Sequence, residues 1–206
     1  MITVKINGEE RQYPQGATYE DVANDYQKEY DDLIALAARD GKIRELFKKL
    51  TRDCEITFFT LKDNVGNKTY VRSATMLFLK AVFDVFGRET VQNCRVEFAI
   101  GNGSYISPKG KIDATEENAA KIRNRMRELV EAKTPFLKRS YSLDNAMELF
   151  RKEGMKDKEK LFRYRRGSFV NIYEMDGYYD YYYGYMLPNA GYVKWFDLIA
   201  YEDGFM

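Results

Sequence analysis

The chain has 206 residues, of which 45% are hydrophobic and 32% are charged, and its formal net charge is +1. This composition is typical of a globular chain with one large or two small domains, and it does not predict a strong attraction of the whole surface to nucleic acid or membrane. The sequence contains no histidine, which excludes Ser-His-Asp and Cys-His mechanisms and removes the commonest general base and metal ligand.

Two further features concern location and redox chemistry. No apolar run approaches the roughly 20 residues that span a bilayer, and the N-terminus lacks the apolar core of a signal peptide. We therefore expect a cytoplasmic protein with no membrane partner. Cys54 and Cys94 are far apart and have no ligand partner nearby, so the sequence predicts two small buried hydrophobes rather than a disulfide or a zinc site.

The first 30 residues predict a hairpin followed by a helix. Residues 2–6 alternate apolar and polar side chains as a half-buried strand does, and Asn7-Gly8 is a strong hairpin signal before a return strand over 9–13. Thr18 is a candidate helix N-cap, and Asp21 stands three residues later, where a capping box places its second partner. This helix is expected to end near residue 30.

The next 30 residues complete a small β-grasp module. An apolar run over 33–38 precedes the turn signal Asp40-Gly41, and residues 55–59 are typical of a last strand. The module resembles a TGS domain, as found in threonyl-tRNA synthetases, over residues 1–61. That resemblance implies ligand or RNA contact, or regulation, and it rests on Ile2-Thr-Val-Lys-Ile6, Tyr13-Pro-Gln-Gly-Ala-Thr18 and Asp53-Cys-Glu-Ile-Thr-Phe58.

After a polar segment over 63–68 that we interpret as a linker, residues 70–86 predict a long buried helix that Gly87 ends. Arg72 and Met76 lie four positions apart on it. The stretch resembles the part of threonyl-tRNA synthetases that carries His-x-x-x-His, a spacing at which two imidazoles can hold one metal ion. Here Arg72 and Met76 occupy those positions. The alternative is that Met76 packs in the core and Arg72 reaches a surface carboxylate.

The middle of the chain predicts a strand over 95–100, then Gly101-Asn102-Gly103 and Tyr105. This part resembles a synthetase loop near the pocket, although the residues alone favour a simple turn between strands. Further along, the patterns predict a helix from Asp113 or Thr115 to residue 132, a strand over 135–141, a helix from Ser142 to Gly154, a short helix over 156–161, and strands over 169–173 and 194–201.

Basic side chains gather in two places of the second half. They are a helical group with Arg123 and Arg127, and a cluster of Arg163, Arg165 and Arg166. Each set is interpreted either as a solvated face or as a patch that binds an RNA backbone.

Six tyrosines lie between residues 178 and 185, before a turn at Pro188-Asn189. They predict either a half-buried sheet edge or one wall of a pocket. The stretch from Asp180 to Gly191 resembles the synthetase motif Asp-Leu-Cys-x-Gly-Pro-His-x-Pro-x-x-Gly, with Tyr182 at the cysteine position and Met186 at the histidine position. All four ligand positions are thus changed, so no metal and no cofactor are expected.

A second resemblance covers nearly the whole chain. Bacterial uridine-kinase-like proteins carry a TGS domain and an editing-like domain before a P-loop kinase domain. The residues concerned are Leu161–Arg165, Asp176–Gly184 and Tyr192–Leu198. The resemblance implies an N-terminal portion of a longer ATP-dependent nucleoside kinase, with a kinase domain as its partner.

The predicted fold class is α+β, with a small β-grasp domain over residues 1–61 and an editing-like α+β domain over 62–206 that has an antiparallel sheet and a long buried helix. The predicted function is a non-catalytic, regulatory pocket for a small anionic or aromatic ligand. The alternatives are an RNA- or tRNA-binding module and a metal-free hydrolase with Asp180 or Glu97 as the base. The candidate pocket residues are Arg72, Met76, Gly101, Asn102, Tyr105, Asp180, Tyr182, Tyr185 and Met186.

Overall fold

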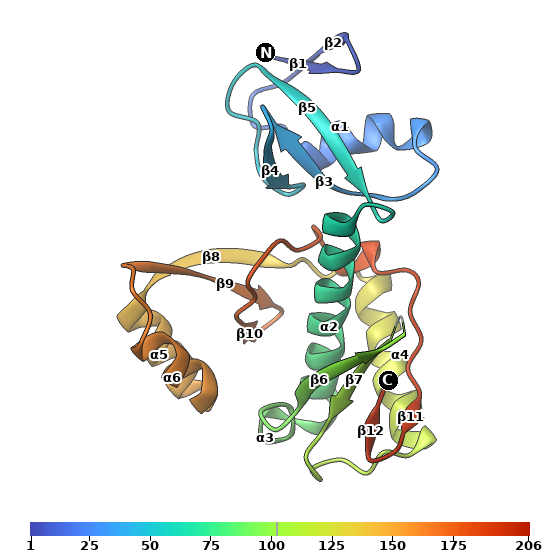
Figure 1. Ribbon diagram of the computed structural model, residues 1–206, viewed down its shortest axis with the longest axis vertical. Coiled ribbons are helices and arrows are strands. Elements are labelled where there is room, and N and C mark those ends of the chain that lie inside the picture. The colour runs from blue at the N-terminus through green and yellow to red at the C-terminus, as the bar shows by residue number, and fades with distance from the viewer. Residues whose placement is uncertain (102) are drawn as a thin grey trace. The chain divides into compact units, whose positions relative to one another are not determined.

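The computed structural model describes residues 1–101 and 103–206 (Figure 1). The chain divides into two compact units. The first consists of Met1–Ser73 with Tyr183–Pro188, and the second of Ala74–Tyr182 with Asn189–Met206. Helices and largely antiparallel sheets make up both units, which confirms the predicted α+β class.

The first unit contains a five-stranded sheet in the order β2-β1-β5-β3-β4. Strands β1 and β5 pair in parallel. On one side, β2 forms an antiparallel hairpin with β1, and on the other side β3 pairs antiparallel with both β5 and β4. This is the predicted β-grasp arrangement. Its elements are β1 (Ile2–Ile6), β2 (Glu9–Tyr13), α1 (Tyr19–Tyr26), the 3-10 turn η1 (Gln27–Glu29), β3 (Ile34–Arg39), β4 (Lys42–Glu45) and β5 (Cys54–Thr60).

Both hairpin turns of this sheet form where the sequence predicts them. Asn7-Gly8 and Asp40-Gly41 have positive φ at both positions, 53° and 88° in the first turn and 49° and 75° in the second. Paired positive φ angles give a turn whose twist matches that of the flanking strands. These dipeptides therefore fix the registers of β1 with β2 and of β3 with β4.

The predicted capping box is present at the start of α1. The Thr18 hydroxyl accepts a hydrogen bond from the Asp21 backbone N–H at 3.1 Å, and the Asp21 carboxylate accepts one from the Thr18 N–H at 2.7 Å. The cap orients α1 so that Tyr19, Val22 and Tyr26 are buried.

Replacing Thr18 with alanine is expected to lower the free energy of unfolding by about 1 kcal/mol, because the first turn of α1 loses a side-chain acceptor. Urea unfolding followed by circular dichroism measures the change. Thr18→Ser is the matched control, since it keeps the hydroxyl and should retain nearly all of the stability. Equal stabilities of the two variants would contradict this role of the cap.

The predicted linker at 63–68 is wrong, because helix α2 (Asn64–Phe86) begins inside it. The Asp63 carboxylate accepts a hydrogen bond from the Thr60 N–H at 2.7 Å, and the Asp63 carbonyl accepts one from Asn67 N–H at 2.8 Å. A Cβ at Gly66 would lie 2.0 Å from the Thr60 carbonyl oxygen. Gly66 therefore permits a close backbone contact and does not mark a flexible segment.

The second unit contains two antiparallel sheets, in the orders β10-β9-β8 and β11-β12-β7-β6. Its strands are β6 (Arg95–Ile100), β7 (Gly103–Ser107), β8 (Leu137–Ser142), β9 (Phe169–Met175), β10 (Tyr178–Asp180), β11 (Ala200–Tyr201) and β12 (Gly204–Phe205). Its further helices are α3 (Arg88–Val91), α4 (Glu116–Glu131), α5 (Leu143–Lys152), α6 (Lys156–Arg163) and the 3-10 turn η2 (Ala190–Tyr192).

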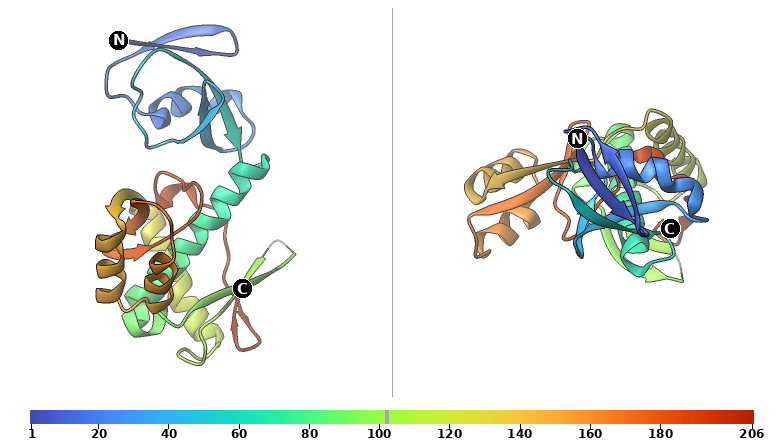
Figure 2. Two further views of the ribbon diagram at one scale, coloured as in Figure 1. Left: turned by 60° about the vertical axis from the view of Figure 1, so that its left-hand side comes forward. Right: turned by 90° about the horizontal axis from the view of Figure 1, so that it is seen from above.

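Within this unit, α2 is the buried helix that the sequence predicts. Leu77, Ala81 and Val82 are fully buried, and the Phe78 ring lies 6.2 Å from that of Phe205 in β12. Helices α2 and α4 lie on one side of the four-stranded sheet (Figure 1). Figure 2 shows α5 and α6 side by side next to the β8–β9 ribbon.

Two expectations need correction. The closing strand predicted over 194–201 is limited to Ala200–Tyr201, because the preceding residues form η2 and irregular chain that packs Val193 and Leu198 inward. Both cysteines are free, but only Cys94 is buried while Cys54 is partly exposed.

Among the described helices, none combines the length and apolar character needed to cross a membrane.

Candidate functional site

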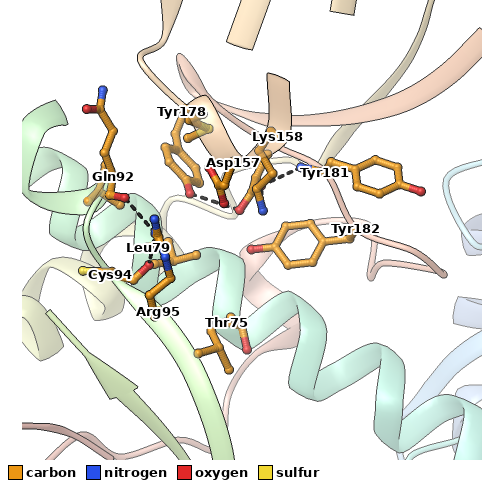
Figure 3. A pocket seen from close by; sticks show the side chains of 14 residues that line it. Thr75, Leu79, Gln92, Cys94, Arg95, Asp157, Lys158, Tyr178, Tyr181 and Tyr182 are labelled. Atoms are coloured by element: carbon orange, nitrogen blue, oxygen red, sulfur yellow. Dashed lines mark hydrogen bonds and ion pairs between the residues drawn. The ribbon is translucent and has the colours of Figure 1, made fainter. Parts of the chain in front are cut away.

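The second unit contains a cavity of about 330 Å³ between α2, α6, the start of β6 and the end of the β10 segment (Figure 3). Its polar and aromatic lining includes Thr75, Arg95, Lys158, Asp180, Tyr181 and Tyr182. The tyrosine stretch thus forms an edge strand of one sheet and also lines this pocket.

Asp180 is the buried acidic group of the pocket, with 4% of its surface exposed. Its Oδ1 lies 2.9 Å from the Lys158 ammonium and accepts a hydrogen bond from the Tyr181 N–H at 2.7 Å. Its Oδ2 accepts a hydrogen bond from the Tyr178 hydroxyl at 3.2 Å. Both carboxylate oxygens are therefore engaged, which offsets the loss of water around a buried charge.

Three tyrosines surround this carboxylate. Burial, and secondarily the charge of Asp180, raises the pKa of Tyr178 well above its ordinary value, so its hydroxyl stays protonated as a donor. The Tyr181 ring contacts Phe162 edge-on at 5.0 Å, and the Tyr182 ring contacts Tyr173 edge-on at 6.4 Å. In Figure 3 the Tyr182 side chain extends into the pocket, whereas that of Tyr181 extends away from it.

The opposite side of the pocket is formed by α3 and the start of β6. The Arg95 guanidinium donates to the Gln92 carbonyl at 2.7 Å and to the Cys94 carbonyl at 2.9 Å. Burial raises the pKa of the Cys94 thiol to about 12. A thiol with this pKa is protonated at neutral pH and is a poor nucleophile.

Some predicted residues of the second unit are not part of the lining. Met76 is fully buried in α2. Tyr105 lies on the four-stranded sheet, where its ring stacks on Phe98 at 5.0 Å, and its hydrogen bond to Asp203 raises its pKa to about 12. Gly101 occupies the turn after β6 with φ +56°, and Asn102 lies outside the described residues.

In the first unit, α2 holds the segment 183–188 through several hydrogen bonds. The Arg72 guanidinium donates to the Tyr185 carbonyl at 2.7 Å, and a Cβ at Gly184 would lie 2.6 Å from the guanidinium carbon. The Leu187 N–H donates to the Ser73 hydroxyl at 3.0 Å. The third turn of α2, which contains Arg72 and Ser73, therefore anchors a segment more than 100 residues later.

Met186 is held in the same place. Its backbone N–H donates to the buried Glu45 carboxylate at 3.2 Å, and its sulfur lies 3.9 Å from the Ser73 hydroxyl. The structure thus brings Arg72, Tyr185 and Met186 together in the first unit, while Asp180 and Tyr182 line the cavity of the second. The single pocket of all nine residues stays a prediction.

Several cavity residues were not predicted from the sequence, including Thr75, Arg95 and Lys158. The spacing of charged residues in α6 predicts a helix but does not show that Lys158 meets Asp180. Within residues 1–101 and 103–206, no three Asp, Glu or Cys side chains are grouped so that they could hold a metal ion.

Nearly the whole chain is similar in sequence to part of a known class of protein. No family model matches the sequence. Threonine–tRNA ligase of Thermotoga maritima is 29% identical over 204 residues, which cover 97% of this chain and 30% of the ligase. The chain therefore resembles a threonine–tRNA ligase region along nearly all of its length.

Related ligases give the same picture. The enzyme of Symbiobacterium thermophilum is 26% identical over 94% of this chain, and that of Porphyromonas gingivalis is 24% identical over 97%. The chain spans about 30% of the length of these relatives. Since they are ligases, they support the synthetase-like interpretation and give no support to the predicted kinase context or to the TGS assignment.

Proposed function

We propose that this chain is a tRNA-related module that binds RNA and receives an unpaired nucleoside in the cavity of its second unit. The observation that carries the proposal is the pocket itself, in which tyrosine rings, two basic side chains and two aspartates surround a space of about 330 Å³. The match to a threonine–tRNA ligase, which covers 97% of this chain, supports RNA as the ligand class.

The chemistry of the lining suits a nucleoside. A volume of this size lies at the lower end of the range for small-ligand pockets, roughly 300 to 1,000 Å³. The Tyr182 ring, which extends into the cavity, offers a face on which any base can stack. Lys158 is paired with Asp180, whereas the Arg95 guanidinium donates to two backbone carbonyls and keeps its positive charge for a neighbouring phosphate, where charge-assisted hydrogen bonds are stronger than neutral ones.

We assign the pocket a binding role rather than a catalytic one. Both oxygens of Asp180 have donors or an ammonium group beside them, and the Cys94 thiol is protonated at neutral pH. Glu97, the other base considered, forms an ion pair with Lys109 and does not line the cavity. Of these three candidates, Asp180 is engaged, Cys94 is protonated, and Glu97 lies outside the cavity.

Replacing Tyr182 with alanine is expected to weaken tRNA binding about tenfold, since one base–aromatic stack is worth about 1–3 kcal/mol. Fluorescence anisotropy with end-labelled tRNA at 100 mM salt measures the dissociation constant. Tyr183→Ala is the matched control, because Tyr183 is the adjacent tyrosine, is 88% exposed and does not line the cavity. Absence of tRNA binding by the unmodified chain, or equal losses in both variants, would contradict the proposal.

We further propose that this chain acts beside a kinase domain of a longer protein. The resemblance of residues 1–61 to a TGS domain, and of the tyrosine-rich stretch to uridine-kinase-like proteins, implies a regulatory role beside a P-loop kinase domain. Reading the coding sequence beyond Met206 for Gly-x-x-x-x-Gly-Lys-Ser/Thr tests that setting separately from RNA binding.

A further inference from the structure

The turn that joins α6 to β9, residues 163–169, presents aromatic rings to solvent. Tyr164 is 83% exposed and Phe169 is 67% exposed. Two exposed aromatic side chains in one short turn are a candidate interaction surface. We refer to residues 163–169 as the α6–β9 turn.

Positive charge is concentrated around these rings. The segment 156–169 has six basic and two acidic side chains, whereas the whole chain has a formal net charge of +1. Arg163, Arg165 and Arg166 flank Tyr164 and are all exposed. The Arg163 guanidinium lies 3.7 Å from a carboxylate oxygen of Glu159, a loose surface pair that binding of a phosphate can replace at little cost.

The backbone of the turn is anchored although its side chains are exposed. Phe162, just before the turn, is buried against Phe150 at a ring distance of 5.5 Å. The Arg165 N–H donates to the Phe162 carbonyl at 3.2 Å, and the Ser168 carbonyl accepts a hydrogen bond from Leu143 N–H at 3.2 Å. A surface held in this way loses little conformational entropy when it binds a partner.

The turn is also continuous with the cavity wall. The Arg165 guanidinium lies over the Tyr181 ring at 5.3 Å and hydrogen bonds to its hydroxyl. Tyr181 is one of the residues that line the cavity. Arg165 therefore links the α6–β9 turn to a residue of the cavity lining.

We propose that the α6–β9 turn binds a single-stranded RNA segment, with bases stacked on Tyr164 and Phe169 and phosphates bound by Arg163 and Arg166. This inference rests on the proposed function and identifies the strand-binding surface that leads to the pocket. Bases can stack on protein rings only where they are not stacked in a duplex, so the surface selects unpaired RNA. Arginine suits this role because its planar guanidinium pairs with phosphate and also stacks on bases.

The other basic surface is less suitable for RNA. On α4, Arg123 forms ion pairs with Glu116 at 2.9 Å and Asp197 at 3.3 Å. Arg125 forms ion pairs with Asp84 and Glu128 at 2.8 and 2.7 Å. Carboxylates thus offset much of the positive charge of this helix.

The test uses fluorescence anisotropy with a labelled 12-nucleotide single-stranded RNA of mixed sequence, across a range of salt concentrations. Tyr164→Ala/Phe169→Ala is expected to weaken binding at least tenfold, because two stacking faces are lost. Arg163→Ala/Arg166→Ala is expected to lower the magnitude of the slope of log K against log salt by about 1.4, since each phosphate contact on a single strand contributes about 0.7. Tyr164→Trp with Phe169 unchanged keeps both stacking faces and should bind as tightly as the unmodified chain.

Matched controls separate this inference from the proposed function. Tyr183→Ala removes an equally exposed tyrosine, and Arg127→Ala removes an exposed arginine of α4; both should bind within twofold of the unmodified chain. If the unmodified chain binds RNA and Tyr164→Ala/Phe169→Ala binds it equally tightly, RNA binding by the α6–β9 turn is refuted and the proposed function stands. If it binds no RNA, both fail. Binding to phosphatidylserine vesicles that the same substitutions abolish, with RNA binding unaffected, would overturn the inference in favour of a membrane surface.

Discussion

Replacing Asp84 with asparagine is expected to lower the free energy of unfolding by about 3–5 kcal/mol, because it leaves a buried ammonium group poorly compensated. The Lys80 side chain is only 3% exposed, and its Nζ lies 2.8 Å from Asp84 Oδ1. Its other contacts are the Asp176 carbonyl at 2.7 Å and the largely exposed Asp176 carboxylate at 3.2 Å. Urea unfolding followed by circular dichroism measures the loss.

Two companion variants test the electrostatic cause. Lys80→Met should be less damaging than Asp84→Asn, because Asp84 keeps its ion pair with Arg125 at 2.8 Å. The double variant Lys80→Met/Asp84→Asn should be more stable than Asp84→Asn alone, since the poorly compensated buried ammonium group is removed. Glu128→Gln is the surface control and should change stability by no more than about 0.5 kcal/mol. A loss below 1 kcal/mol for Asp84→Asn would refute the argument.

The second large effect is expected at Gly66, where alanine should lower the free energy of unfolding by about 3 kcal/mol. Its Cβ would lie 2.0 Å from the Thr60 carbonyl oxygen and 2.8 Å from the carbonyl carbon. Since both atoms belong to the backbone, the end of β5 and the start of α2 would have to move apart, and such overpacking typically costs 1–3 kcal/mol or more. Chemical unfolding measures the total, and hydrogen exchange at residues 58–66 should show faster opening of this junction.

Asn67→Ala is the matched control for this substitution. Asn67 is the next residue of α2 and is exposed, so alanine there should be neutral or stabilising by a few tenths of a kcal/mol through its higher helix propensity. Similar stabilities of Gly66→Ala and Asn67→Ala would show that the close contact at Thr60 has little energetic weight.

Features with a local physical cause could be predicted from the sequence. Asn7-Gly8 and Asp40-Gly41 form hairpin turns because few other dipeptides adopt positive φ at both positions. The caps at Thr18 and Ser142 form because each hydroxyl reaches an N–H three residues later. These signals, together with apolar spacing, were sufficient to predict the α+β class and the β-grasp arrangement.

The parts that could not be predicted depend on contacts between distant segments. Gly66 is compatible with a flexible linker and with a close packing contact, and only the position of the Thr60 carbonyl decides between them. The pairing of Lys158 with Asp180 links α6 to the end of β10, and nothing in either segment specifies the other. Most of the pocket lining was missed for this reason, whereas Asp180 and Tyr182 were found because they lie in the unusual tyrosine stretch.

The return of residues 183–188 to the first unit has a consequence for synthesis of the chain. About 110 residues separate Ser73 from Tyr183, and translation at roughly 5–20 residues per second takes on the order of 5–20 s to add them. Until then, the hydrogen bonds from Arg72 to Tyr185 and from Leu187 to Ser73 cannot form. The β-grasp sheet therefore leaves the ribosome before the segment that packs on it exists, and the first unit is completed only when residues 183–188 have been made.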